Sequence, residues 1–148
     1  MISQCPQVKS IVRDAVVSAA PSTSLADIAQ LMADETVGSV VIVDGERPQG
    51  IVTDRDIALA TAAHGTDPES ATAADVMSDD IVTVDADSGI FEVLRAMTEA
   101  NVRRIPATDA DGDLAGIVTF DDFVVLLGRE LKLLGEVVEA EIPLYEHT

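Results

Sequence analysis

The chain has 148 residues, of which 47% are hydrophobic, and it carries 27 acidic against 9 basic residues, for a net charge of −18. A chain of this length can form one compact unit with its own core, because folding would bury roughly 68–70% of the unfolded surface. The negative charge excludes a nucleic-acid binder, and no apolar stretch approaches the roughly 18 residues needed to cross a bilayer.

Cysteine and histidine are scarce in this chain. Cys5 is the single cysteine and cannot form an intramolecular disulfide, and the two histidines, His64 and His147, do not stand at metal-ligand spacing. The first residues also lack the basic flank and the apolar run of a signal peptide. We therefore expect a protein of the reducing cytoplasm that requires no metal and no cofactor.

The excess of acidic residues has two interpretations. It can form an acidic surface for a basic partner, or a solvated shell over all faces, as in proteins from very salty cytoplasm, where a Debye length of roughly 3 Å at 1 M salt screens the self-repulsion. Asp and Glu are distributed along the whole chain. This distribution favours the shell and predicts a halophilic source.

The first elements in the chain are a short strand and a helix. A β-branched run at residues 16–18 predicts the strand, and Ser24 with Asp27 form a capping box where the helix begins. The apolar stripe of the helix consists of Leu25, Ile28, Ala29, Leu31 and Met32. Residues at this spacing share one helix face, so we assign them to the core.

A pair of strands and a second helix follow. The β-branched run at residues 40–43 predicts a buried strand, an Asp-Gly turn occupies residues 44–48, and a third strand covers residues 50–52. A helix is expected from about residue 54 to residue 63. The predicted order in the first half is therefore strand, helix, strand, strand, helix.

From residue 75 the same order begins again. The second strand-helix pair comes from a β-branched run at residues 81–84 and an apolar stripe at helical spacing, Ile90, Val93, Leu94 and Met97. Residues 102–106 correspond to residues 37–41 at an offset of 65, and one extra residue in the turn at 109–113 raises the offset to 66. A period this long indicates a duplicated domain rather than a solenoid repeat.

The best-preserved segment of the duplication joins a strand to a helix. Residues 50–56 read Gly-Ile-Val-Thr-Asp-Arg-Asp, and residues 116–122 read Gly-Ile-Val-Thr-Phe-Asp-Asp. Each copy has a threonine three positions before an aspartate, and both residues stand where a helix is expected to begin. The pattern is that of a capping box, in which the two side chains satisfy free backbone amides.

The last helix carries more apolar residues than one small repeat can cover. They are Phe123, Val124, Leu126, Leu127, Leu131, Leu134, Val137 and Val138. The stripe can belong to the core, which we favour, or it can form a contact with a second chain.

The duplicated elements and the repeated Gly-Ile-Val-Thr-x-x-Asp motif resemble a tandem pair of cystathionine β-synthase (CBS) domains, also called a Bateman module. The resemblance covers roughly residues 8 to 135. It implies an α/β (α+β) fold of two β-α-β-β-α repeats related by pseudo-twofold symmetry, at residues 8–64 and 75–135. A linker at residues 65–74 joins them, and an acidic tail occupies residues 136–148.

The resemblance also implies two clefts between the repeats that bind AMP, ADP, ATP or S-adenosylmethionine, and a homodimer of such modules. The aspartates of the motif hold the ribose hydroxyls, and the threonines lie near the sugar or phosphate. The positions that this resemblance assigns to the clefts are Thr53, Arg55, Asp56, Val37, Gly38, Ser39, Ser78, Thr83, Arg103, Arg104, Ile105, Pro106, Thr119 and Asp122.

The residue types at these positions suit a nucleotide. A carboxylate can accept from both hydroxyls of a ribose, a helix N-terminus favours an anion, and arginine makes two-point contacts to phosphate. The capping box remains an alternative role for the aspartates, and surface ion pairs remain one for Arg103 and Arg104.

The sequence thus predicts a non-enzymatic regulatory module that senses an adenosine-containing ligand and signals to a separate, unidentified protein. It contains no nucleophile-base pair and no phosphate-binding loop with the G-x-x-x-x-G-K pattern. Two alternatives are a scaffold whose dimer surface is the function, and a Mg²⁺ sensor built on Asp109, Asp111 and Asp113. The Asp-x-Asp-x-Asp run lacks the remaining calcium-loop spacing, so we predict a turn there.

Overall fold

The structure is a computed structural model that describes residues 16–78 and 80–141. Cys5, His147 and the apolar lead-in at residues 8–12 lie outside the described residues. Within the described part, no helix is long and apolar enough to cross a membrane.

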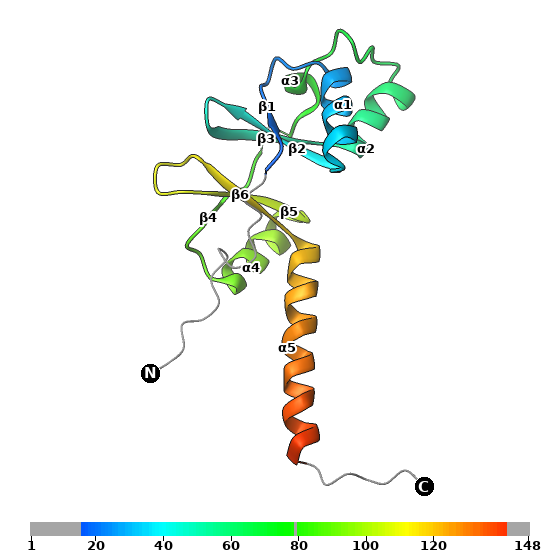
Figure 1. The fold of residues 1–148 in the computed structure, drawn as a ribbon. Coiled ribbons are helices and arrows are strands. Elements are labelled where there is room, and N and C mark those ends of the chain that lie inside the picture. The colour runs from blue at the N-terminus through cyan, green and yellow to red at the C-terminus, as the bar shows by residue number, and fades with distance from the viewer. Residues whose placement is uncertain (1–15, 79, 142–148) are drawn as a thin grey trace, which may run out of the picture.

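The chain forms two similar units, each with a three-stranded sheet and helices (Figure 1). The elements of the first repeat are β1 (Ser18–Ala19), α1 (Leu25–Glu35), β2 (Ser39–Asp44), β3 (Arg47–Thr53), α2 (Asp54–Ala58) and the π-helix η2 (Leu59–Ala63). Those that follow are α3 (Ala73–Val76), β4 (Val84–Asp85), α4 (Ile90–Ala100), β5 (Arg104–Thr108), β6 (Leu114–Thr119) and α5 (Phe120–Glu141). The predicted β-α-β-β-α order is confirmed in both repeats.

The two sheets have the same topology. In the first, β1 pairs with β2 in parallel and β2 pairs with β3 antiparallel. In the second, β4, β5 and β6 pair in the same way. Since the helix between the first and second strands of each sheet is a crossover connection, each repeat is a small βαβ unit with an added antiparallel strand.

Each repeat has its own core on the helix side of its sheet. In the first repeat, Val40, Ile42 and Val52 pack with Leu25 and Ile28 of α1. In the second repeat, the core consists of Ile90, Val93, Met97, Ile105, Val118 and Phe123. Met32 is 7% exposed and Met97 4% exposed, and the prediction that these helix stripes are core is confirmed except at Ala29, which is exposed.

The two sheets face each other, with the helices on the outer sides (Figure 1). Val41 and its counterpart Pro106 are fully buried although neither belongs to a core cluster of its own repeat, since each points to the opposite face of its strand. The hairpin turns also touch, because the Leu114 amide donates to the Glu46 carbonyl (2.8 Å) and Arg47 Nη2 donates to the Asp111 carbonyl (3.2 Å).

Strand bounds differ from the predictions at several edges, and β1 covers Ser18–Ala19 in place of the predicted residues 16–18. β3 begins at Arg47 and includes Pro48, because the hairpin turn uses only Gly45 and Glu46 and the proline pairs with Val43 at a register shift on an edge strand. The strand predicted at residues 81–84 begins only at Val84, since β4 pairs with just two residues of β5.

Helix bounds differ as well. The helix predicted at residues 54–63 changes from α-helix to π-helix at Leu59, where the His64 amide donates to the Leu59 carbonyl (3.1 Å). The short helix α3 was not predicted. It packs on the first repeat, because Ala71 and Ala73 are in that core and the Ala73 amide donates to the Thr23 carbonyl (2.9 Å).

Helix α5 has 22 residues and extends beyond the body of the molecule (Figure 1). Phe123 alone is fully buried on it, and Leu126 packs partly against the core. The prediction that the whole apolar stripe of this helix belongs to the core is therefore wrong within one chain. The repeat ends too early to cover the helix beyond its first two turns.

Candidate functional site

A cleft of about 250 Å³ lies between the two repeats. The residues that line it are Val16, Val17, Thr36, Val37, Gly38, Ser39, Val41, Arg104, Ile117, Thr119 and Asp121. The first seven come from the first repeat and the other four from the second. Neither repeat could form this cleft alone.

The first-repeat wall is the loop between α1 and β2. Thr36 ends α1 in the left-handed conformation (φ 55°), and its counterpart Asn101 ends α4 in the same way (φ 53°). The Asp54 amide then donates to the Gly38 carbonyl (3.0 Å), which fixes the loop against the start of α2. A Cβ on Gly38 would lie 3.3 Å from Asp54 Oδ2 and 3.8 Å from Arg104 Nη2. The small residue therefore lets the arginine of the second repeat approach this wall.

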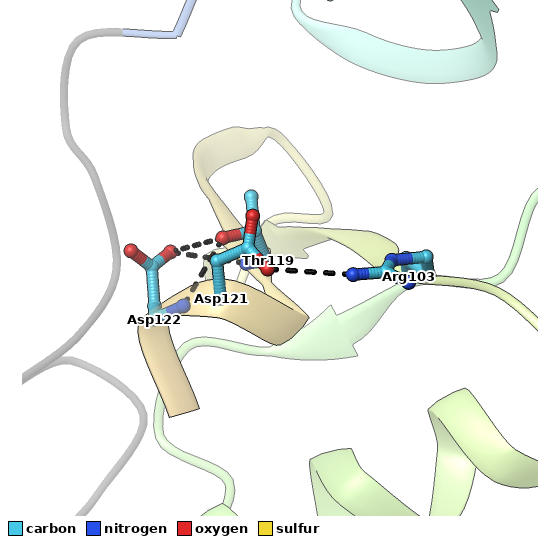
Figure 2. A network of polar contacts seen from close by, with 4 residues as sticks. All are labelled: Arg103, Thr119, Asp121 and Asp122. Atoms are coloured by element: carbon cyan, nitrogen blue, oxygen red, sulfur yellow. Dashed lines mark hydrogen bonds and ion pairs between the residues drawn. The ribbon is translucent and has the colours of Figure 1, made fainter. Parts of the chain in front are cut away.

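The second-repeat wall is the junction of β6 and α5 (Figure 2). The Phe120 amide donates to the Arg103 carbonyl (2.8 Å), which is the counterpart of the bond between Asp54 and Gly38. This bond holds the Arg103-Arg104 segment beside Thr119 and Asp121. The repeated sequence thus produces the same loop-to-helix connection on both sides of the molecule.

Arg103 and Arg104 have different surroundings. Arg103 forms an exposed ion pair with Asp121 (3.4 Å), which Figure 2 shows. Its guanidinium also lies 5.1 Å from the ring centre of Phe120. Arg104 is partly buried at the cleft and forms no ion pair with the described residues. Its positive charge is therefore directed to the cleft, where it can attract an anion.

Both Thr-x-x-Asp motifs form capping boxes. Asp56 Oδ2 accepts from the Thr53 amide (2.8 Å) and Thr53 Oγ1 accepts from the Asp56 amide (3.2 Å). In the second repeat, Asp122 Oδ2 accepts from the Thr119 amide (3.1 Å) and from Thr119 Oγ1 (2.8 Å) (Figure 2). The capping alternative is confirmed, and it is compatible with a second role, because a carboxylate has about four acceptor positions.

Five of the predicted site residues meet in the cleft, namely Val37, Gly38, Ser39, Arg104 and Thr119. Asp122 is adjacent to the cleft but is not among its described lining residues, where Asp121 stands instead. Thr53, Asp56 and the exposed Arg55 lie at the equivalent junction of the first repeat.

The other predicted positions are arranged differently. The side chain of Ile105 belongs to the core of the second repeat, so only its backbone could contact a ligand there. Pro106 is fully buried between the sheets. Ser78 and Thr83 are exposed, and the Ser78 carbonyl lies against Gly50 of β3.

The sequence interpretation missed several lining residues, chiefly Val16, Val17, Ile117 and Asp121. A signal for the first two was present, since the offset of 65 residues maps the predicted cleft position Thr83 onto Ser18, which directly follows them. Asp121 had no such signal, because the motif identifies the following residue.

A second cavity of about 310 Å³ lies between the two hairpins. Its lining includes Glu46, Asp109 and Asp113, with Ser18 and Gly45. Asp109 Oδ1 accepts from the amides of Asp111 (2.9 Å) and Asp113 (3.0 Å), so the predicted turn in the Asp-x-Asp-x-Asp run is confirmed. An acidic lining of this kind does not suit a phosphate, which leaves the cleft at Arg104 as the candidate site.

The CBS domain family model matches residues 8–63 and 73–129 of this chain. The chain belongs to the CBS domain family. The duplication inferred from the sequence is thus a pair of CBS domains, and the inter-repeat cleft lies between them.

Similar proteins include a hypoxic response protein and an uncharacterised protein. The chain is 41% identical over 100 residues to hypoxic response protein 1 of Mycobacterium tuberculosis, which covers 67% of this chain and 69% of that protein. It is 35% identical over 118 residues to an uncharacterised protein of Methanopyrus kandleri, and the match spans 79% of this chain but 60% of that protein's length.

Solved structures of CBS proteins share the fold. The crystal structure of hypoxic response protein I with two coordinated zinc ions has a TM-score of 0.72 and 35% identity, covering 80% of this chain and 97% of that one. A CBS domain pair in complex with 5′-methylthioadenosine and S-adenosyl-L-methionine has a TM-score of 0.76 and 26% identity, covering 85% and 98%.

Proposed function

We propose that this CBS domain pair is a regulatory module, not an enzyme, that binds an adenosine-containing ligand in the inter-repeat cleft. The candidate ligands are AMP, ADP, ATP and S-adenosylmethionine. Occupancy changes the geometry of the repeats or of a homodimer and is read by a separate protein in the cytoplasm. Such signalling requires the ligand to prefer one geometry over another.

The observation that carries the proposal is the composition of the cleft. Gly38 and Ser39 from one repeat and Arg104 and Thr119 from the other line a single cavity of about 250 Å³. That volume is close to the lower limit of the roughly 300–1,000 Å³ typical of small-molecule sites, which suits one nucleoside better than a dinucleotide. The related domain pair that was crystallised with two adenosyl compounds supports the same ligand class.

The charge of the cleft supports an anionic group on the ligand. Asp121 is paired with Arg103, whereas Arg104 faces the cleft without an ion-pair partner in the described chain. Asp56 lies outside this lining, at the equivalent junction of the first repeat. Its Oδ2 caps its own helix, and its Oδ1 accepts no hydrogen bond from described residues, so it can accept from a ribose hydroxyl of a ligand that reaches that junction. Phosphate at Arg104 and ribose at an aspartate are the contacts we assign.

The alternatives receive less support from the structure. At Asp109 a Mg²⁺ sensor would share the carboxylate with the turn, since Oδ1 accepts from the amides of Asp111 and Asp113. The described residues contain no group of three or more His, Cys, Asp and Glu side chains that could hold a metal. The scaffold alternative differs from our proposal in one respect, since it predicts that the cleft binds none of the candidate ligands.

Calorimetry and thermal shift with AMP, ADP, ATP, S-adenosylmethionine and NAD test this proposal. We expect at least one adenosyl ligand to raise the melting temperature of the wild type. A ligand at 100 times its Kd adds about 2.7 kcal/mol to the free energy of unfolding. Asp56→Ala and Asp122→Ala should weaken binding at the site that each residue serves, by roughly tenfold or more for a lost charge-assisted contact.

A matched control separates ligand contact from helix capping. Asp75 caps α3 by accepting from the Thr72 amide (2.8 Å), and neither residue lines the cleft. Asp75→Ala should therefore lower stability without changing ligand affinity. If no adenosyl ligand binds the wild type, the scaffold interpretation replaces the sensor; if affinity is unchanged in both Asp56→Ala and Asp122→Ala, the assigned ribose contacts are wrong.

A further inference from the structure

Helix α5 has an apolar surface that nothing in the described chain covers. Its exposed large apolar residues are Phe120, Val124, Val125, Leu127, Leu131, Leu133, Leu134, Val137 and Val138. The CBS match ends at residue 129, and the part of α5 beyond it extends away from both repeats (Figure 1). Contiguous apolar surface of this kind on a charged protein marks an interaction site.

Six of these residues follow one another at alternating spacings of four and three. They are Phe120, Val124, Leu127, Leu131, Leu134 and Val138, which we call the α5 stripe. An apolar residue every 3.5 positions on average is the seam of a coiled coil, where each side chain fits between four residues of a facing helix. The stripe runs along about 27 Å of helix at roughly 1.5 Å per residue.

The free part of the helix needs a partner to be stable. Residues 130–141 are all exposed, so no tertiary contact from the body supports them. Isolated helices shorter than roughly 12–15 residues are marginal in water, because few hydrogen bonds offset the cost of nucleation. The helical form of this segment is therefore best explained by burial of the stripe against another helix.

A second copy of this chain fits the stripe better than an unrelated partner. A four-three seam is complementary to itself, and no member of the α5 stripe is charged, so two chains of net charge −18 can meet there at the least electrostatic cost. Gly128 and Gly135, one heptad apart, lie next to the stripe, and a Cβ at either would meet nothing within 4 Å. A facing helix can approach closely on that side.

The surface continues from the helix onto the body. A groove of about 380 Å³ between α4 and α5 is lined by Phe91, Leu94, Leu126 and Leu127, and Phe91 is 74% exposed. Each side chain of the α5 stripe, and that of Phe91, exposes an accessible surface on the order of 100 Å². If two copies bury all of these side chains against each other, the interface buries on the order of 1,400 Å². Stable interfaces bury about 1,200–2,000 Å².

We propose that the α5 stripe is the surface on which two copies of this chain pair, helix against helix, with Phe91 at the margin of the contact. The inference specifies the interface of the homodimer proposed above. It does not depend on which ligand the cleft binds, since the stripe and the cleft share no residue.

Sedimentation velocity over a range of concentrations tests this interface. We expect wild-type chain to sediment as a dimer, and the double variant Leu131→Glu/Leu134→Glu as a monomer, with a dissociation constant raised on the order of a hundredfold or more by the buried unpaired carboxylates. Both positions are exposed in the single chain, so the two repeats of the monomer should remain folded, with a cooperative urea transition, while circular dichroism loses the helical signal of residues 130–141.

Val125→Glu is the matched control. Val125 is 54% exposed on the same helix but lies outside the α5 stripe, about 100° around the helix from Val124 on the side away from Leu127. This variant should remain dimeric. A wild type that is monomeric at all concentrations overturns the dimer itself. A double variant that stays dimeric, or an equal effect of Val125→Glu, overturns only the interface. Ligand titration of the monomeric variant tests the sensor function separately.

Discussion

Gly50 opens the repeated motif of the first repeat, and a close contact explains why a glycine stands there. Gly50 is buried on β3 where the segment after α3 crosses it, and an added Cβ would lie 2.9 Å from the Ser78 carbonyl oxygen, 3.0 Å from Met77 Sδ and 3.1 Å from Met77 Cβ. Two of these three neighbours are a backbone atom and a Cβ, which cannot move as the end of a side chain can. The glycine therefore lets residues 77–78 lie against the first sheet.

Gly50→Ala should destabilise the protein by about 1–3 kcal/mol, the usual cost of overpacking a closely packed site. Urea denaturation followed by circular dichroism measures this change. Gly128→Ala is the contrasting glycine when both variants are made in the monomeric Leu131→Glu/Leu134→Glu chain, because a Cβ there meets nothing within 4 Å in the single chain and alanine favours a helix interior by roughly 0.5–1 kcal/mol. If both variants change stability equally, the contact at Ser78 is not what requires the glycine.

The sequence identified Gly50 as a repeated position but not the reason for it. The reason is a contact with residues 77–78, which are 27 and 28 positions away, and no local pattern reports such an approach. The same limit applies to Asp121, which lines the cleft because α5 begins at Phe120. Thr119, in contrast, was predictable from the motif because its place depends on the local strand-to-helix turn, and Arg104, at the start of β5, was predictable from the family resemblance.

At the scale of the element, four helices of the described chain begin with side-chain caps, whereas α4 begins after Gly89 without one. Ser24 Oγ accepts from the Asp27 amide (3.1 Å), and Thr53, Thr72 and Thr119 each pair with the aspartate three residues later. Every such cap satisfies backbone N–H groups that have no partner within the helix. Because the caps depend on local sequence, the starts of α1, α2 and α5 could be read from the sequence alone, whereas α3 was missed although Thr72 and Asp75 form the same box.

Thr119→Ala should lower the free energy of unfolding by about 0.5–2 kcal/mol, because the Asp122 amide loses its acceptor and the carboxylate loses the donor at 2.8 Å. Thr119→Ser keeps the oxygen and should stay close to wild type. The measurement is urea denaturation without added ligand. An equal loss in the serine variant would mean that the methyl group, and not the cap, is the important part of Thr119.

Ends of elements and edges of sheets were harder to predict than helix starts. The run at residues 81–84 has β-branched residues, but strand pairing begins at Val84 since β5 offers partners only at Ala107 and Thr108. Helix α3 is four residues long, and its alanines gain their place from the first repeat's core rather than from helical periodicity. For α5, periodicity predicted an apolar face correctly but could not say whether the body would cover it.

At the scale of the whole molecule, duplication explains both the fold and the cleft. Because each sheet uses one face for its own helices, the other face is left for its counterpart, and Val41 and Pro106 become buried there. The offset of 65 residues was sufficient to predict two equal units. The offset could not predict at which of the two equivalent loop-to-helix junctions the candidate cleft would form. That depends on differences between the repeats, such as Gly38-Ser39 in one and Arg103-Arg104 in the other.

The charge of the molecule is the property on which its stability should depend most strongly in solution. Acidic residues outnumber basic ones by 27 to 9, and the described chain contains no buried charged residue, so the charges lie on the surface and repel one another through solvent. Screening shortens the range of this repulsion from about 8 Å at 0.15 M salt to about 3 Å at 1 M. Folding brings the charges closer together, so the native state gains more from screening than the unfolded chain.

The melting temperature should therefore rise between 0.15 M and 2 M KCl, by roughly 3–4 °C for each kcal/mol gained at this chain length. The scan is best made on Leu131→Glu/Leu134→Glu as well as on wild type, because dimer formation would itself add a salt-dependent and concentration-dependent term. Sucrose at matched osmolality stabilises by exclusion from the surface without screening charge, and it provides the control. A melting temperature that stays level or falls in KCl, or that rises equally in sucrose, would contradict the view that the acidic shell is adapted to a salty interior.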